Sequence, residues 1–529
     1  FLTVADVSQM MRDLPMRTAA RVSGTGSLIT YLLRISTVEP ILGPTRETLP
    51  EIHIDVESAR RDEVDRAIFD RYGTNRVALV SRHPDGVILG DSHLLGLTPV
   101  QPSTRGLPMS QFDEHDLNDV GLVKLDILGV PLQSSMAFAL DEIERINSTR
   151  AASAGALPID APYVDRQGRI ELDAIPREVE PTHEADHPHP SFDLPTYQSA
   201  WLKAHYPAEF LAGTLTHDPG RYPKHLQLTE AGRMGIPVLP LDVNTSDDVY
   251  HVERIKPPRT PVARTYPGEL GIRLSLVEVQ GITGAELQRV VANRPYTSIT
   301  DFHQRATPSR RLFERLGQVG ALDSLGGEGR TRGDVLIRIR QLTSRSKRPV
   351  RADVVNQLDF AVDESNEVPT GTPDVSTRER VSDELDVPSM EVSEHVVESY
   401  RPMLDDLGVT RAADLLNNWN GTTVLVAGIR IATQTPPMRS GKRVVFISLD
   451  DGSGCSDSTF FEEAQNRAGS LLFGTRLMLI RGRTRRTGER GISLEADNAW
   501  DLKQMWRDWK TARLATGAHG DADADLVSP

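Results

Sequence analysis

A strongly acidic stretch in the second half of the chain sets the first limit on how this sequence folds. Residues 353–406 hold 15 acidic side chains against three arginines, and they are rich in Pro, Ser, Thr and Val without a sustained helical or strand period. A segment of high net charge buries too little apolar surface to form a core of its own. We therefore expect residues 351–395 to be an acidic flexible linker between two folded parts.

The rest of the sequence has the composition of a soluble multidomain protein. Its 529 residues, 38% of them hydrophobic, are enough for several cores at about 150 residues each. The single cysteine, Cys455, excludes a disulfide scaffold and a multi-cysteine zinc site. No apolar run approaches the roughly 18 residues of a membrane span, and the start of the chain shows no secretion signal. We therefore expect a cytoplasmic protein that does not contact membranes.

Basic side chains are concentrated in two islands, although the formal net charge is −14. Residues 301–350 contain 11 Lys or Arg against 5 acidic residues, and residues 476–490 contain six Arg and one Glu. An acidic chain is poorly suited to coating nucleic acid without specificity, but such islands allow local contacts with phosphate groups. A solvated surface is the alternative for each island taken alone.

A glycine- and serine-rich segment near the start has the composition of a phosphate-binding turn. Ser23, Gly24, Gly26 and Ser27 lead directly into an apolar helical run. Backbone N–H groups converge in such a turn, and a helix N-terminus adds positive potential. An ordinary helix N-cap has a similar sequence, so both interpretations stay open.

Two expected strands carry charged residues among apolar ones. A strand-like alternation puts His53 and Asp55 on one face, and a second apolar segment is interrupted only by Lys124 and Asp126, again two residues apart. A buried Asp or Lys is costly unless it binds something. If the two strands are adjacent, Asp55 and Asp126 could hold Mg²⁺, which prefers oxygen ligands and substrate phosphates. A structural ion pair with Lys124 is the alternative.

Six segments of the chain follow one another as in a known family. They are residues 21–33, 49–55, 71–73, 111–113, 121–129 and 197–210. Together they resemble the C-family bacterial DNA polymerases, the polymerase III alpha subunits, and most closely their error-prone branch. The last segment, which begins Tyr-Gln-Ser-Ala-Trp, is nearly identical to a motif of that family. The similarity extends to about residue 505, apart from the acidic stretch.

The resemblance implies an α/β multidomain fold. The expected parts are a partial C-family polymerase palm (1–175), a remnant of the fingers (186–250), a helix-hairpin-helix DNA-binding domain (251–350), the acidic linker, a C-terminal OB-fold β-barrel (396–515) and a tail (516–529). The family places its thumb between two segments that are only ten residues apart here, so we expect the thumb to be missing near residues 80–83. Most of the fingers are skipped as well.

The resemblance also implies a two-metal Mg²⁺ site. Asp55 and Asp126 stand at two of the family's three catalytic, metal-binding aspartates, and His53 stands at the third. Imidazole is a poor ligand for Mg²⁺, so we expect an impaired site. The residues expected to bind the nucleotide are Ser23, Gly24, Gly26, Ser27 and Lys124.

The second half of the chain resembles the family's DNA-binding modules. Gly281 and Gly284 stand in a helix-hairpin-helix turn, which binds a DNA phosphate through backbone N–H groups without reading bases. Residues 421–500 resemble the OB-fold, a barrel that binds single strands by a basic groove and stacking. The arginines expected to contact DNA are Arg483, Arg485 and Arg486. The candidates for stacking are Phe446, Phe460 and Phe461, with the barrel core as the alternative for each.

Two functions are therefore in competition. The first is DNA-directed DNA polymerisation from dNTPs on a primed template, in DNA replication or repair. The second is a catalytically degenerate paralogue that binds primed or single-stranded DNA and replication or repair partners without polymerising. Gln357–Phe360 resembles a sliding-clamp motif, which would make the clamp one of those partners.

Overall fold

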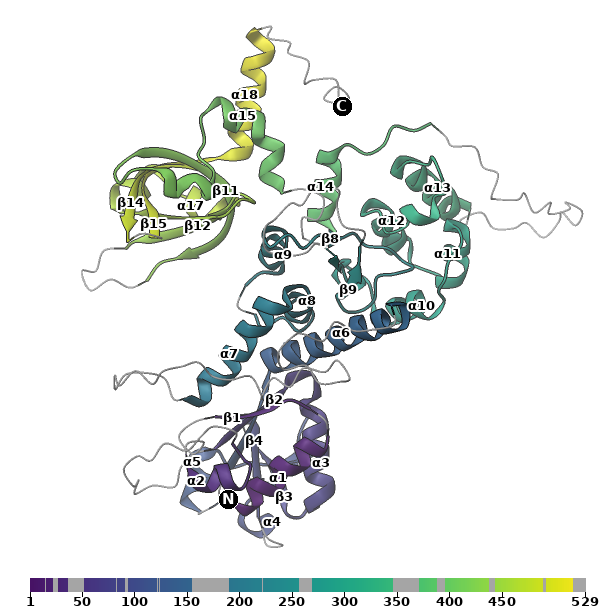
Figure 1. The fold of residues 1–529 in the computed structure, drawn as a ribbon, viewed down its shortest axis with the longest axis vertical. Coiled ribbons are helices and arrows are strands. Elements are labelled where there is room, and N and C mark those ends of the chain that lie inside the picture. Colours follow the sequence, from purple (N-terminus) through teal and green to yellow (C-terminus); the bar gives the residue numbers. More distant parts are fainter. Residues whose placement is uncertain are drawn as a thin grey trace, which may run out of the picture. The chain divides into compact units, whose positions relative to one another are not determined.

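The computed structural model describes most of the chain. The described residues are 1–14, 16–21, 27–36, 52–81, 83–90, 94–120, 122, 124–154, 190–220, 222–255, 269–345, 371–387, 395–436, 443–488 and 491–516. Several predicted features lie outside them, namely Ser23, Gly24, Gly26, the clamp-like segment Gln357–Phe360 and all of the expected tail except Thr516. The chain divides into two compact units, residues 1–222 with 250–272 and residues 223–249 with 273–529 (Figure 1).

The first unit is built on a seven-stranded sheet with the order β1-β2-β7-β4-β3-β6-β5. The strands are β1 (Thr18–Arg21), β2 (His53–Glu57), β3 (Val77–Val80), β4 (His83–Leu89), β5 (Val100–Pro102), β6 (Pro108–Ser110) and β7 (Lys124–Val130). β2 and β7 are parallel neighbours, and β1 and β4 flank them in antiparallel pairs. The strands that carry Asp55 and Asp126 are therefore adjacent, as a site shared by the two aspartates requires.

Among the helices, α1 (Leu2–Asp13) and α3 (Arg61–Tyr72) cover one face of this sheet with an apolar core, while α4 (Leu94–Leu97) and α5 (Glu114–Asp119) pack against alternate residues of β3 and β4. The other helices of this unit are α2 (Leu28–Leu32), α6 (Pro131–Ala154), α7 (Pro190–His205) and α8 (Pro207–His217). Ile54 and Val56 of β2 and Ile127 of β7 are buried in one cluster with Val7 of α1 and Ile68 of α3. Because side chains alternate along a strand, the charged residues of β2 and β7 share the opposite face.

The polymerase-like motif at 197–210 forms the end of α7 and the start of α8. Trp201 and Phe210 pack with Met136 of α6 in a buried cluster. α6 and α8 approach so closely that a Cβ on Gly213 would lie 2.3 Å from the carbonyl oxygen of Ser135. The motif is thus a packing element that holds three helices together.

Residues 250–272 belong to the first unit, whereas residues 223–249, which precede them, belong to the second. Residues 250–272 contain β9 (His251–Arg254) and most of β10 (Leu270–Arg273), which are neighbours in a small sheet. The backbone N–H of Val252 donates a hydrogen bond of 2.9 Å to Glu142 of α6. This hydrogen bond joins β9 to α6, a contact that sequence patterns do not reveal.

The helical part of the second unit is well capped. Its elements are α9 (Lys224–Arg233), β8 (Val238–Leu239), α10 (Gly284–Ala292), α11 (Ile299–Ala306), α12 (Arg310–Gln318), α13 (Arg332–Arg345) and α14 (Thr377–Asp386). Thr283, Ser298 and Ser309 each accept a backbone N–H at the start of α10, α11 and α12. Phe302 and Phe313 are fully buried between these helices. Side-chain caps of this kind fix where each helix begins.

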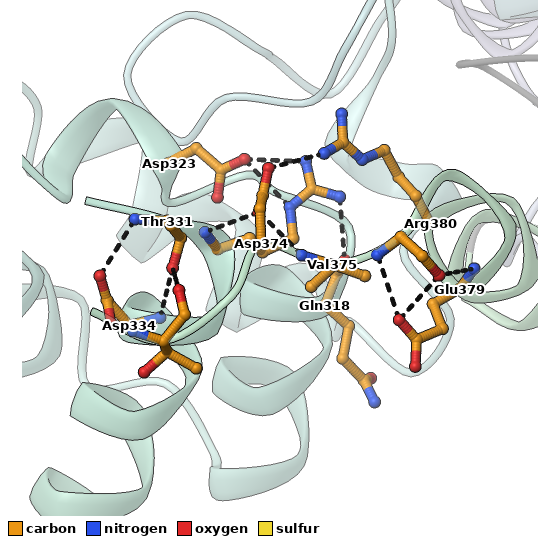
Figure 2. A network of polar contacts seen from close by, with 11 residues as sticks. Gln318, Asp323, Thr331, Asp334, Asp374, Val375, Glu379 and Arg380 are labelled. Atoms are coloured by element: carbon orange, nitrogen blue, oxygen red, sulfur yellow. Dashed lines mark hydrogen bonds and ion pairs between the residues drawn. The ribbon is translucent and has the colours of Figure 1, made fainter. Parts of the chain in front are cut away.

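Residues 371–387, which the charge pattern assigned to the flexible linker, are folded. An extended segment leads into α14, and both contact the helix-hairpin-helix region (Figure 2). Asp374 accepts the backbone N–H of Arg332 at 3.2 Å and lies 3.1 Å from the Arg380 guanidinium. Val381 and Val387 are buried. Hydrogen bonds from Thr331 and Arg332 and burial of these valines hold the segment, and local charge does not reveal such tertiary contacts.

The C-terminal part of the second unit is a closed five-stranded barrel with the order β11-β12-β13-β15-β14. The strands are β11 (Thr423–Gln434), β12 (Val445–Asp450), β13 (Cys455–Phe460), β14 (Leu477–Thr487) and β15 (Gly491–Asp501). α16 (Glu462–Ala468) and α17 (Leu471–Gly474) stand between β13 and β14. This is the five-stranded arrangement of the OB-fold, so the predicted barrel is confirmed. α15 (Arg401–Asp406) and α18 (Leu502–Thr516) complete the part.

Candidate functional site

The register of β2 and β7 brings the predicted acidic-site residues together. His53 lies directly opposite Asp126, and Asp55 lies opposite Leu128, two residues beyond Asp126. Lys124 shares the face of Asp126 because it is two residues away on the same strand. The two aspartates are therefore diagonal neighbours on one face of the sheet.

Each of these carboxylates already contacts a cation or imidazole of the chain. Asp126 Oδ2 lies 3.1 Å from Lys124 Nζ and 3.1 Å from His53 Nε2. Arg21, directly opposite His53 on β1, brings its Nε within 2.8 Å of Asp55 Oδ1 and 2.7 Å of Oδ2. Asp55 is 4% exposed, and burial raises its pKa to about 6 although Arg21 lowers it. At neutral pH the face therefore holds two ion pairs.

This arrangement does not fit a magnesium site. In the part of the chain that the structure describes, no group of three or more His, Cys, Asp or Glu side chains is placed to hold a metal ion. A Mg²⁺ ion on Asp55 would displace Arg21, and one on Asp126 would displace Lys124. The imidazole of His53 is turned toward Asp126 and contributes a nitrogen donor that Mg²⁺ disfavours. The ion pair with Lys124, the alternative to a metal site, is present.

Sequence reasoning missed two groups on this face. Arg21 was noted only as part of a family segment, and nothing in its spacing predicted that it would bind Asp55. Glu57 continues the polar face and accepts the backbone N–H of Arg17 at 2.6 Å, while burial raises its pKa. Both contacts depend on the pairing of β1 with β2. No local pattern of the sequence could have found either contact, because each depends on which strands pair.

Ser27 is the only member of the predicted phosphate-binding turn within the described residues. Its side chain accepts the N–H of Ile29 at 3.2 Å and caps the five-residue helix α2. The geometry at Ser27 is thus that of a helix N-cap, the alternative interpretation of this segment. Its assignment to nucleotide binding stays a prediction.

The helix-hairpin-helix turn is exposed and tightly held. Gly281 has φ +82°, a conformation that strains residues with a side chain, while nothing lies within 4 Å of a Cβ on Gly284. Arg315 donates a hydrogen bond to the carbonyl of Gln280, and the N–H of Gln280 donates to Val387 at 3.2 Å. The turn that the family uses for phosphate therefore keeps open space in front of Gly284.

A groove of about 210 Å³ crosses the outside of the barrel. Its lining residues are Phe446, Thr459, Phe461, Arg485, Ser493, Leu494 and Glu495. Phe446 is 38% exposed and Phe461 42% exposed, so two of the three predicted stacking rings face the groove. Phe460 is fully buried in the barrel core, the location that the sequence analysis gave beside stacking for each ring. Phe460 ends β13 on the inward side of the alternation, whereas Phe461 follows the strand and caps α16.

The three predicted DNA-binding arginines separate into two places. Arg483 and Arg485 are exposed on the outer side of β14, and Arg485 lines the groove. Arg486 donates to the carbonyl of Leu416 at the end of the barrel. Glu495 stands directly opposite Arg483 in the β14–β15 register. The groove thus combines two aromatic rings, the guanidinium of Arg485 and the carboxylate of Glu495.

A barrel with an exposed aromatic and basic groove, together with a helix-hairpin-helix turn, is the combination expected of the nucleic-acid-binding class of proteins. No helix in the described part of the chain is long and apolar enough to cross a membrane. The family described as "Bacterial DNA polymerase III alpha NTPase domain" matches residues 1–82 and 79–129, and "Helix-hairpin-helix motif" matches residues 235–332. Over these parts the chain is similar to the bacterial C-family of DNA polymerases, the family that its motifs predicted.

Curated relatives agree with this assignment. An error-prone DNA polymerase of Symbiobacterium thermophilum is 31% identical over 309 residues, which are 54% of this chain and 28% of that protein. One of Sinorhizobium medicae is 28% identical over 350 residues, 64% of this chain and 30% of that protein. The chain thus spans less than a third of the length of these relatives.

Proposed function

We propose that this chain is a member of the DNA polymerase III alpha family that holds primed or single-stranded DNA without polymerising it alone. One observation carries the proposal. Both carboxylates at the family's catalytic positions, Asp55 and Asp126, are ion-paired with cations of the chain itself. The residue at the third position is His53, which contacts Asp126 as well.

Freeing these carboxylates for a metal would be expensive. Arg21 and Lys124 are largely buried, with side chains 27% and 15% exposed. A buried ion pair broken by removing one partner costs about 3–5 kcal/mol because the other charge is left without compensation. A divalent cation would add its own repulsion to both displaced cations. The polar face is therefore better suited to structural ion pairing than to two-metal catalysis.

The connection between β3 and β4 supports the absence of a thumb. The two strands form an antiparallel pair in which Val80 lies opposite His83, so the chain reverses there within a few residues. The family match is also divided at this point, into two pieces that overlap at residues 79–82. A thumb supplies grip on the duplex, and positioning is a major part of phosphoryl-transfer catalysis.

The DNA-binding modules, in contrast, keep the features that binding needs. The hairpin turn has free space in front of Gly284, and the barrel groove has two exposed rings beside Arg485. Backbone N–H groups bind phosphate in the first module, and stacking with a basic groove binds single strands in the second. Neither mode requires the acidic face.

The test is primer extension beside DNA binding, both with the full chain. Extension of a labelled primer on a template is measured with Mg²⁺ and with Mn²⁺, and affinity for the same primed template is measured by fluorescence anisotropy. We expect binding that weakens as salt rises, because counterions are released, and no extension. Extension that Asp126→Ala abolishes would overturn the proposal.

A second candidate is DNA-directed DNA polymerisation from dNTPs, the activity in the names of the relatives. The observation that favours it is the placement of Asp55 and Asp126 on one face of adjacent strands. In this case Arg21 and Lys124 would bind the triphosphate and release the carboxylates to Mg²⁺. Stimulation of metal binding by dNTP, measured by the Mn²⁺ electron paramagnetic resonance signal, would favour this candidate. The sliding clamp and a cytoplasmic location stay predictions in either case.

A further inference from the structure

Trp419 is the most exposed large apolar side chain among the described residues. It lies in the loop that precedes β11 and is 86% exposed. An indole has one of the largest apolar surfaces of any side chain, and Trp is enriched where proteins bind partners. The exposed ring of Trp419 is therefore a candidate for contact with a ligand or partner.

The loop that carries this ring is fixed by hydrogen bonds to the end of β14. The carbonyl of Trp419 accepts the hydroxyl of the buried Thr484 at 2.6 Å. Gly421 N–H donates to the carbonyl of Thr484 at 2.7 Å, and Arg486 N–H donates to the side chain of Asn420 at 2.9 Å. A pre-organised loop loses little freedom when a ligand binds. The loop therefore holds the exposed indole of Trp419 in a fixed place.

The loop that carries Trp419 runs beside arginines of β14. The loop continues the β11–β14 ladder beyond the pair Thr423–Arg483, so that it runs beside Arg485 and Arg486. The Arg486 guanidinium is held at the same end of the barrel by the carbonyl of Leu416. An aromatic face beside guanidinium groups is the combination that binds single-stranded nucleic acid, through base stacking and phosphate contacts.

We propose that Trp419 is a second base-stacking platform, which extends the barrel groove across β14 for single-stranded nucleic acid. This inference rests on the proposed single-strand binding. It adds Trp419 to that site and extends the path that the single strand follows on the barrel. Going from Phe446 on β12 over β13, β15 and β14 to the loop takes four interstrand steps. At about 4.8 Å each, this path measures about 19 Å along the curved surface. Arg485 lies between the two aromatic positions, as a contact for phosphate.

The length of this path makes the proposal testable with oligonucleotides. OB-folds occupy from about 4 to about 16 nucleotides. An oligothymidylate of about 4 nucleotides engages the groove alone, whereas one of about 12 nucleotides reaches Trp419 as well. Affinities of the full chain for both are measured by fluorescence anisotropy at low salt. The variants are Trp419→Ala, Trp419→Phe and Phe461→Ala. Phe473→Ala is the matched control, since Phe473 is 59% exposed but precedes the opposite end of β14.

The expected results follow from the value of stacking, about 1–3 kcal/mol per base. Trp419→Ala weakens binding of the longer oligonucleotide about 5- to 150-fold and leaves the shorter one within about twofold. Trp419→Phe retains most of the affinity, because a ring is still present. Phe461→Ala weakens both lengths, and Phe473→Ala neither. Unchanged melting temperatures exclude unfolding as the cause.

Two outcomes would overturn the proposal, and they can be told apart. If the wild-type chain binds the longer oligonucleotide and Trp419→Ala binds it equally well, Trp419 is not a stacking platform, while single-strand binding by the groove stands. Such a result would direct the search to a protein partner for this ring. If the wild-type chain binds neither length, the proposed single-strand binding fails and the inference fails with it.

Discussion

Replacing His53 by Asp rebuilds the family's three carboxylates, and we expect this change to lower stability without producing polymerase activity. His53 Nε2 lies 3.1 Å from Asp126 Oδ2 across the β2–β7 pair. An aspartate at position 53 would replace this contact by two like charges. At a separation of about 4 Å and an effective dielectric constant of about 20, two unit charges repel by about 4 kcal/mol.

Solvent reduces this repulsion, because the side chains of His53 and Asp126 are 27% and 14% exposed. We therefore expect His53→Asp to lose about 1–3 kcal/mol of unfolding free energy at neutral pH. His53→Asn is the matched control, since it removes the imidazole without adding a charge. Urea unfolding followed by circular dichroism gives the difference between the two variants, and adding Mn²⁺ shows whether a metal relieves it.

Primer extension completes this experiment. If the thumb is missing as predicted, its loss and the ion pairs of Arg21 and Lys124 leave the rebuilt carboxylates without a positioned substrate. Robust extension by the single variant His53→Asp would refute the reasoning, and it would show that the ion pairs open readily and that the short β3–β4 connection is compatible with catalysis. A variant as stable as His53→Asn would refute the electrostatic part alone.

Three further predictions concern other parts of the chain. Burial raises the pKa of Glu209 from 4.5 to about 7, so the wild-type free energy of unfolding is highest below pH 4.5 and falls as the pH rises to 7. The free energy of unfolding of Glu209→Gln, measured in urea, should therefore rise relative to the wild type by about 2–3 kcal/mol between pH 5 and pH 8. A difference that does not change with pH would contradict this. Gly284→Val should leave the melting temperature unchanged, because nothing lies within 4 Å of a Cβ at this position, but it should weaken binding to duplex DNA. Gly281→Val should lower the melting temperature instead, because Gly281 has φ +82°. Arg485→Ala should weaken single-strand binding and flatten its salt dependence by about 0.7 in slope, whereas Glu495→Gln should strengthen binding by removing the groove's carboxylate; equal salt slopes for both variants and the wild type would place the strand elsewhere.

The sequence by itself determined the elements whose signals are local or carried by motifs. Period-two alternation predicted the strands of His53 and Asp126, and their adjacency is confirmed by the register. Short strands with turn signals predicted the five-stranded barrel, which closes as expected. The hairpin motif at Gly281 and the polymerase segments pointed to the family that the comparisons support. These features survive because alternation and turn chemistry act over a few residues.

Only the tertiary structure decided the charges and contacts between distant segments. Arg21 neutralises Asp55 because β1 pairs with β2, and no spacing in the sequence announces that contact. The acidic segment at 371–387 is held by hydrogen bonds to Thr331 and to the backbone of Arg332 and by the burial of Val381 and Val387. One position of register at the end of β13 separates the buried Phe460 from the exposed Phe461. Electrostatic compensation and burial depend on which segments are in contact in the folded protein, and the composition of a segment does not contain that information.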